Sequence, residues 1–200
     1  ALAVAIARAL LTHAKRPIDV ATLTHAAGAS ETLVHGRPSG VDVALAIAGG
    51  TGVFRRSTGL APLAGVPPLR VLVGPSGAPR STAAMVERVA QATSSLRDDP
   101  RLRELGALTD SGTAALLAAD LPTLGDAMNR AHTLLADLGV STSQLDALCS
   151  TARQAGAHGA KLTGAGGGGA VIAIAPRDRE AAVLAAWKQA NVDGFVATVR

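Results

Sequence analysis

The chain has 200 residues, of which 48% are hydrophobic and 17% charged, and its formal net charge is +4. This balance excludes an intrinsically disordered chain and allows one domain, or two small ones, with a substantial core. The sequence has two Phe, one Trp and no Tyr, which argues against nucleic-acid binding by base stacking. Its scattered arginines likewise predict no nucleic-acid partner.

Cys149 is the only cysteine of the sequence, so no internal disulfide can form and a reducing cytoplasm fits. It lies in the apolar stretch LDALCSTAR, which favours a buried thiol over a nucleophile. No apolar run reaches the ~18–20 residues that a membrane span needs, so we expect no membrane partner. Ala1 opens the chain inside a helical pattern with no capping residue before it, which predicts that the natural beginning is absent.

The first third of the chain mixes helical and β-like patterns. Residues 1–14 predict a helix that is apolar nearly all round and therefore buried. A turn at Pro17 leads into a short helix to about Ala27, and Ser30 then caps a second short helix with Glu31 in its first turn. Residues 41–50 are β-like, and TGVFRR predicts their hairpin partner, with the turn at Gly49–Gly52.

Longer helices dominate the rest of the chain. A strand over LRVLVG (69–74) precedes a helix over about 82–96, which Pro79 and Ser81 open. Further helices are predicted, with breaks, over DDPRLRELGALTDSGTAALLAAD, from Pro122 to about Leu138, from a Ser143 cap to about Ala155, and over 178–190. AVIAIAP and GFVATVR read as strands. Because strands and helices do not alternate regularly, the predicted fold class is α+β.

Five of the six residues 164–169 are glycine, in the stretch AKLTGAGGGGAVIAIAP. The letters satisfy G-x-G-x-x-G, but a dinucleotide site needs a strand before the glycines and a helix after them. Here the pattern predicts a helix before the loop and a strand after it, and no G-x-x-x-x-G-K-[ST] sequence occurs. Two interpretations stay open: a loop whose N–H groups bind an anion, and a tight packing turn.

ETLVHGRPSGVD (31–42) holds two carboxylates, Glu31 and Asp42. One carboxylate could help to hold a divalent cation, and the other could orient a hydroxyl group for phosphoryl transfer. The alternative is a glutamate in a helix N-terminal turn and an aspartate at a strand edge. Arg80 and Thr82 stand at a predicted helix N-terminus, which favours binding of a carboxylate or phosphate about as well as a solvated arginine.

HGRPSGVD (35–42) and KLTGAGGGG (161–169) together resemble motifs of the mevalonate kinases, a family of the GHMP kinase superfamily. APRST (78–82) and MNRAHTLLADLGVSTSQLDALCSTAR (128–153) also resemble this family, so the resemblance covers nearly the whole chain. It implies a GHMP kinase-like α+β fold, with an incomplete N-terminal domain over 1–66 and a ferredoxin-like C-terminal domain over 67–200. It also implies ATP-dependent phosphorylation of mevalonate in isoprenoid precursor synthesis.

The resemblance implies a role for each matching residue. Asp42 matches the catalytic aspartate that accepts or orients the proton of the mevalonate 5-hydroxyl group, and Glu31 matches the ligand of Mg²⁺. The implied substrate-binding residues are His35, Ser39, Arg80, Thr82, Thr163 and Ala165, and the implied phosphate loop comprises Gly164, Gly166, Gly167 and Gly168. ATP is the implied co-substrate, the implied location is the cytoplasm, and a homodimer stays possible.

Two earlier motifs of the family are not found: a starting strand whose lysine pairs with the catalytic aspartate, and a GLGSSA loop that holds ATP. ALAVAIARALL resembles the helix that follows this loop, so we expect the chain to begin just after it. Because phosphoryl transfer needs positioned phosphates, we expect the chain alone to show little kinase activity and to aggregate. Two alternatives stay open: another GHMP kinase, such as a phosphomevalonate kinase, and a non-catalytic binding protein.

Overall fold

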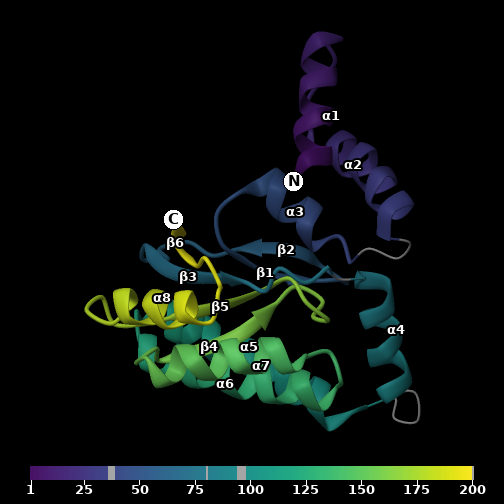
Figure 1. Ribbon diagram of the computed structural model, residues 1–200. Helices are drawn as coiled ribbons and strands as arrows, with labels where there is room; N and C mark the ends of the chain where they lie inside the picture. Colours follow the sequence, from purple (N-terminus) through teal and green to yellow (C-terminus); the bar gives the residue numbers. More distant parts are fainter. Residues whose placement is uncertain (36–38, 80, 94–97, 200) are drawn as a thin grey trace. The chain divides into compact units, whose positions relative to one another are not determined.

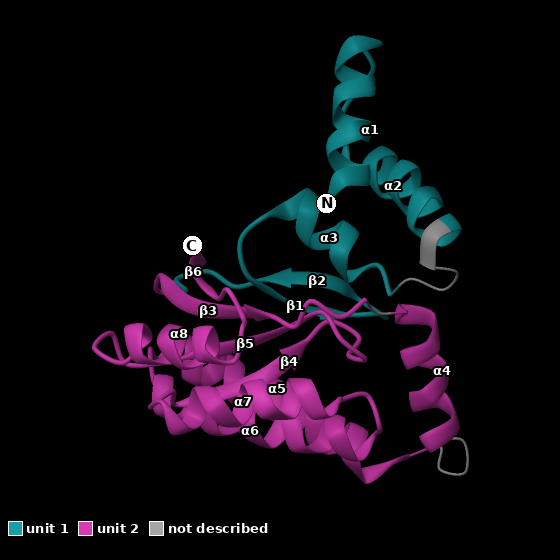
Figure 2. Cartoon of the chain, viewed as in Figure 1, with its two compact units in different colours: residues 1–66, 200 teal, residues 67–199 magenta. Residues whose placement is uncertain are grey.

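The computed structural model describes residues 1–35, 39–79, 81–93 and 98–199. The chain divides into two compact units, residues 1–66 (unit 1) and residues 67–199 (unit 2), which Figure 2 shows in teal and magenta. No helix in the described ranges has both the length and the apolar character needed to cross a membrane.

Unit 1 packs helices around a small apolar core and adds an antiparallel hairpin. Val4, Ala27 and Val43, one from each helix, form that core. The elements within the described residues are α1 Leu2–His13, α2 Val20–His35, α3 Val41–Ala48, β1 Gly52–Arg55 and β2 Gly59–Pro62.

Helix α1 forms where it was predicted, but it is not buried on all sides. Val4 and Ala7 are 2% and 8% exposed, whereas Leu2, Ile6 and Leu10 are 75%, 50% and 64% exposed. These three exposed residues recur every four positions, so they form one apolar stripe along the helix. The prediction that α1 is buried all round is therefore wrong, because only one side of the helix is covered.

Helix α2 replaces the two short helices that were predicted on either side of Gly28. The Asp19 carboxylate accepts a hydrogen bond from the Thr22 N–H, over 2.8 Å, and so caps the start of the helix. Gly28 lies in open space inside the helix, where glycine costs only about 1 kcal/mol relative to alanine. Ser30 is therefore no cap, and Glu31 lies well inside α2 rather than in a first turn.

Helix α3 corrects the strand predicted over residues 41–50. Gly40 has a φ of +89° and leads into the helix, and Gly49, with a φ of +70°, ends it by donating its N–H to Leu45 O. A short apolar run fits a strand or a buried helix equally well, so the pattern of VDVALAIA could not decide between them. The partner of β1 is β2, with Arg55 paired to Gly59, and not residues 41–50.

Unit 2 is a four-stranded antiparallel sheet with helices, shown in Figure 1. Its strand order is β4-β5-β3-β6, and the chain order is strand, helices, two strands, helix, strand, which is the ferredoxin-like arrangement. This confirms the predicted α+β class and the ferredoxin-like domain. The elements are β3 Leu69–Pro75, α4 Thr82–Thr93, α5 Pro100–Leu117, α6 Leu121–Asp137, α7 Ser143–Gln154, β4 Gly159–Thr163, β5 Ala170–Ile174, α8 Glu180–Gln189 and β6 Phe195–Val199.

The core of unit 2 lies between one face of this sheet and its helices. Ala160, Ala173 and Leu72 are neighbours across three strands, and each is 0% exposed. Trp187 of α8 is also 0% exposed and donates its indole N–H to Leu148 O over 3.0 Å. Most helices of unit 2 agree with the predictions, although α5 is continuous and Thr142, not Ser143, caps α7.

Candidate functional site

The glycine loop, residues 164–169, connects two antiparallel neighbours, β4 and β5, directly after the pair Thr163 and Ala170. A strand therefore precedes the loop, and the helix that was predicted there, α7, ends earlier, at Gln154. A strand also follows the loop. The dinucleotide interpretation still fails, because that site requires a helix after the glycines.

All five glycines of the loop have a positive φ, from +71° at Gly167 to +143° at Gly168. The space around them is also closed. A Cβ atom on Gly166 would collide with Val140 O, one on Gly167 would lie 2.7 Å from Met85 Sδ, and one on Gly168 would lie 2.9 Å from Ala78 O. Glycine is therefore required by the backbone conformation and by the close approach of other chain segments.

Hydrogen bonds hold one side of the loop to these segments. Gly167 donates its N–H to Val140 O over 2.8 Å, and Gly169 donates its N–H to Ala78 O over 3.3 Å. Ser76 donates its N–H to Gly169 O over 2.7 Å. The α7 residue Gln144 donates its side-chain amide to Ser76 O over 2.8 Å, so the loop is tied to both β3 and α7.

Four other N–H groups of the loop have no acceptor among the described residues. Within the described part of the chain, the structure shows no hydrogen bond from the N–H of Gly164, Ala165, Gly166 or Gly168. Gly166 and Gly168 are nevertheless buried, and a buried N–H without a partner is costly. A row of such groups in left-handed backbone forms a concavity suited to an anion. The geometry therefore favours the anion interpretation over a simple packing turn.

The helix N-terminus predicted at Arg80 and Thr82 is that of α4. Ser81 Oγ accepts a hydrogen bond from the Ala84 N–H over 3.3 Å, so Ser81 caps this helix. Thr82 is its first residue and is half-buried. Arg80, the predicted anion ligand, lies outside the described residues. Thr163 ends β4 beside the loop, and Ala165 is the one loop residue that carries a side chain.

His132 of α6 lies under β4 and was not identified from the sequence. It is 6% exposed, and its Nδ1 accepts a hydrogen bond from the Leu162 N–H over 3.3 Å. Its Nε2 lies 3.1 Å from the Asp146 carboxylate, which also accepts the hydroxyl of Ser141. Because the Leu162 N–H needs an acceptor, the imidazole carries its proton on Nε2 and donates it to Asp146.

Burial governs the titration of the groups in this region. It lowers the pKa of His132 below its usual value, which Asp146 opposes and the charge of Arg153 reinforces. Burial also lowers the pKa of Lys161, whose ammonium group donates to Leu162 O over 2.7 Å. Burial raises the pKa of Cys149 to about 12. Cys149 is 0% exposed, which confirms the predicted buried thiol.

In unit 1, Asp42 lies in the first turn of α3, at a helix end that favours a carboxylate. Its residue is exposed, and the structure shows no ion pair between Asp42 and another residue that it describes. Ser39 Oγ accepts a hydrogen bond from the Val41 N–H over 3.3 Å, so Ser39 shapes the turn before the helix. The side chain of His35, at the end of α2, lies outside the described atoms.

Glu31, the predicted metal ligand, is a half-buried residue of α2. Among the described residues, no group of three or more His, Cys, Asp and Glu side chains could hold a metal ion. The described residues therefore contain no metal site built from protein side chains alone. Mg²⁺ bound between phosphates needs only one or two carboxylates, so the donor chemistry of Glu31 fits that kind of site.

Comparisons with known proteins show which proteins this chain resembles. Residues 113–193 match the family model described as GHMP kinases C terminal. The chain is 32% identical to the mevalonate kinase of Aeropyrum pernix, over 92% of this chain and 57% of that protein. It is 38% identical to the mevalonate kinase of Pyrococcus horikoshii, over 82% of this chain and 50% of that protein.

A solved structure is also similar to this chain. It is the L. major mevalonate kinase in complex with R-mevalonate, with a TM-score of 0.86 and 30% sequence identity. The match covers 99% of this chain and 64% of that one. The chain thus spans only half to two thirds of the length of these relatives.

Proposed function

We propose that this chain is part of a mevalonate kinase of the GHMP kinase superfamily, which transfers the γ-phosphoryl group of ATP to the 5-hydroxyl group of mevalonate. In this proposal, unit 1 is the remainder of the N-terminal domain and unit 2 is the C-terminal domain. Similarity to mevalonate kinases over 82% to 92% of the chain supports it. The activity is that of the whole protein, which we place in the cytoplasm.

The observation that carries the proposal is the set of loop N–H groups without partners. Gly166 and Gly168 are buried, and within the described residues their N–H groups donate to no protein acceptor. A phosphoryl group offers several strong acceptor oxygens, so it can satisfy such groups together. Donors fixed before the reaction stabilise charge that develops on the transferring phosphoryl group. The glycines also keep side chains out of the space that this group needs.

Asp42 is the proposed catalytic residue, which accepts or orients the proton of the mevalonate hydroxyl group. It lies in the first turn of α3, and a carboxylate can take a proton from a hydroxyl group held within hydrogen-bond reach. Glu31 is the proposed protein ligand of Mg²⁺. When bound, Mg²⁺ neutralises charge on the ATP phosphates, and no dedicated cluster of carboxylates is needed for it.

The remaining proposed roles concern substrate binding. Thr163 and Ala165 frame the glycine loop in unit 2, and Thr82 begins α4. Ser39 shapes the turn before Asp42 in unit 1. Together with His35 and Arg80, these residues are proposed to bind mevalonate and its carboxylate, and a helix N-terminus such as that of α4 suits an anionic group.

Nuclear magnetic resonance of the ¹⁵N-labelled chain tests the loop directly. We expect the amide resonances of Gly164, Gly166 and Gly168 to shift saturably when inorganic pyrophosphate or MgATP is added. Gly156 also has a positive φ, of +102°, but it follows the C-terminal end of α7, so its amide is the matched control and should not shift. Shifts confined to scattered basic side chains, with none in the loop, would contradict the proposed phosphate role.

A further inference from the structure

Residues 137–141, which we call the anchor segment, run from the last residue of α6 toward α7. Three of its carbonyl groups accept hydrogen bonds from three different parts of unit 2. Asp137 O accepts from Arg101 Nη1 over 3.0 Å, and Gly139 O accepts from Arg88 Nη1 over 3.1 Å. Val140 O accepts from the N–H of Gly167 over 2.8 Å. The anchor segment therefore links two arginines to the glycine loop.

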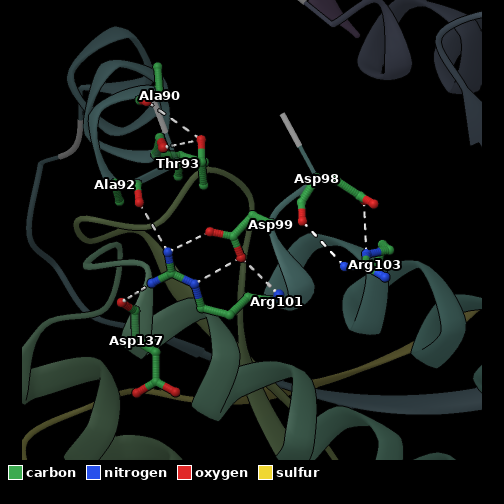
Figure 3. A network of polar contacts seen from close by, with 9 residues as sticks. Ala90, Ala92, Thr93, Asp98, Asp99, Arg101, Arg103 and Asp137 are labelled. Atoms are coloured by element: carbon green, nitrogen blue, oxygen red, sulfur yellow. Dashed lines mark hydrogen bonds and ion pairs between the residues drawn. The ribbon is translucent and has the colours of Figure 1, made fainter. Parts of the chain in front are cut away.

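Arg101 is fixed by a buried partner, as Figure 3 shows. Asp99 is 2% exposed, and it accepts from the Arg101 N–H, from Nε over 3.0 Å and from Nη2 over 2.7 Å. This bidentate pair holds the planar guanidinium in one orientation. The same group then donates to Asp137 O and, over 3.0 Å, to Ala92 O. A lysine could not make all of these bonds, because its ammonium group lacks the fork geometry.

Ala92 lies in the last turn of α4, so Arg101 ties this helix to the end of α6. None of the described residues of α4 is fully buried, but its partly buried Met85 and Val89 pack against the hydrophobic core of unit 2. Met85 also lies directly against Gly167 of the loop. The position of Met85 is therefore set by its packing against the core and by the polar contacts of Arg88 and Arg101.

We propose that Arg88 and Arg101 are positioning residues for the glycine loop. Arg101 fixes the first carbonyl group of the anchor segment and the end of α4, and Arg88 fixes the carbonyl group of Gly139. Together they help to set where Val140 O meets the Gly167 N–H and where Met85 lies against the loop. Neither arginine needs to touch a substrate for this role. The effect of this positioning role on phosphate binding rests on the proposed function, whereas its effect on the conformation of the loop does not.

Amide hydrogen exchange of the full 200-residue chain, followed by mass spectrometry, separates this role from a general loss of stability. In Arg101→Met and Arg88→Met, we expect the two hydrogen-bonded amides of the loop, Gly167 and Gly169, to exchange faster by about tenfold within peptides over residues 164–169. Peptides over 170–175, in β5, should keep their rates. Arg103→Met is the matched control, because Arg103 pairs with Asp98, away from the anchor segment.

Conservative variants sharpen the test. Arg88→Lys keeps a single donor and should restore most of the protection of the loop, whereas Arg101→Lys should not, because it loses the fork. Equal acceleration of 164–169 and 170–175, or the same effect in Arg103→Met, would overturn the proposal. Pyrophosphate titration then distinguishes the proposed function of the chain from the positioning role of the two arginines. If the unmodified chain binds no pyrophosphate while the arginine variants still loosen the loop, the proposed function fails and the positioning role stands.

Discussion

Gly167 donates its backbone N–H to the carbonyl oxygen of Val140 over 2.8 Å, although 27 residues separate them in the sequence. The same oxygen occupies the space that a side chain on Gly166 would need. One backbone carbonyl thus holds Gly167 of the loop and requires the preceding position, 166, to be glycine.

Gly166→Ala should destabilise unit 2 by about 3 kcal/mol, because it combines left-handed strain with a backbone collision. The φ at this position is +86°. Gly77→Ala is the control: its φ is +71°, but no atom lies within 4 Å of its Cβ position. Gly77→Ala should therefore cost only the strain, about 1 kcal/mol. Urea denaturation of the two variants measures both losses of unfolding free energy. Equal losses would show that Val140 O does not exclude a side chain at position 166.

Replacing His132 should change how stability depends on pH. Burial lowers the pKa of His132 in the folded chain, so the unfolded chain binds more protons and stability rises with pH. The contribution of the neutral form is complete above the unfolded pKa, about 6.5, and is lost as the pH falls from there toward the folded pKa. Protonation also removes the acceptor for the Leu162 N–H.

Urea denaturation between pH 7 and pH 5 checks this linkage. The slope of unfolding free energy against pH should be shallower in His132→Gln than in the unmodified chain. An unchanged slope in His132→Gln would mean that His132 is not kept neutral by the fold.

Cys149 should resist alkylation while unit 2 is folded. Its thiol is 0% exposed and has a pKa of about 12, so almost no thiolate is present at pH 8. Iodoacetamide labelling at pH 8, followed by mass spectrometry, should modify the denatured chain quickly and the native chain only at the rate of its unfolding. Rapid labelling of the native chain would contradict the buried core around α7.

Asp42→Ala, made in the full-length gene product that contains this sequence, should lower turnover by about a thousandfold, the scale of a lost general base. Binding of mevalonate should weaken much less, because the proposed role concerns the proton rather than affinity. Steady-state kinetics and calorimetric titration measure these two effects separately. Turnover within about tenfold of the unmodified protein would show that Asp42 is not the catalytic residue.

Most of unit 2 could be predicted from the sequence, because its helices carry strong local signals. Pro100, Pro122 and the capping Thr142 stand at helix starts, and β5 and β6 are short runs rich in apolar residues. In unit 1, the apolar run of α3 fitted a strand as well as a helix. In the structure, Val43 of α3 packs against Val4 and Ala27. These contacts with distant residues favour the helix, and the local sequence pattern does not contain them.

The glycine loop could be identified from the sequence, but not the reason for each glycine. The colliding atoms are the backbone oxygens of Ala78 and Val140 and the sulfur of Met85. Every residue type has a backbone carbonyl group. The identities of Ala78 and Val140 therefore could not indicate that their carbonyl oxygens contact the loop. The same holds for Arg88 and Arg101, whose acceptors in the anchor segment are the backbone carbonyl groups of Gly139 and Asp137.

The central claim is the chemical identity of the phosphate acceptor. An assay of ADP release by the full-length gene product, with ATP and Mg²⁺ and with either mevalonate or phosphomevalonate, tests it most directly. We predict ADP release that depends on mevalonate, with 5-phosphomevalonate as the product and no release with phosphomevalonate. ADP release with phosphomevalonate alone would contradict the account in favour of another GHMP kinase, and binding of both ligands without any ADP release would favour a non-catalytic protein.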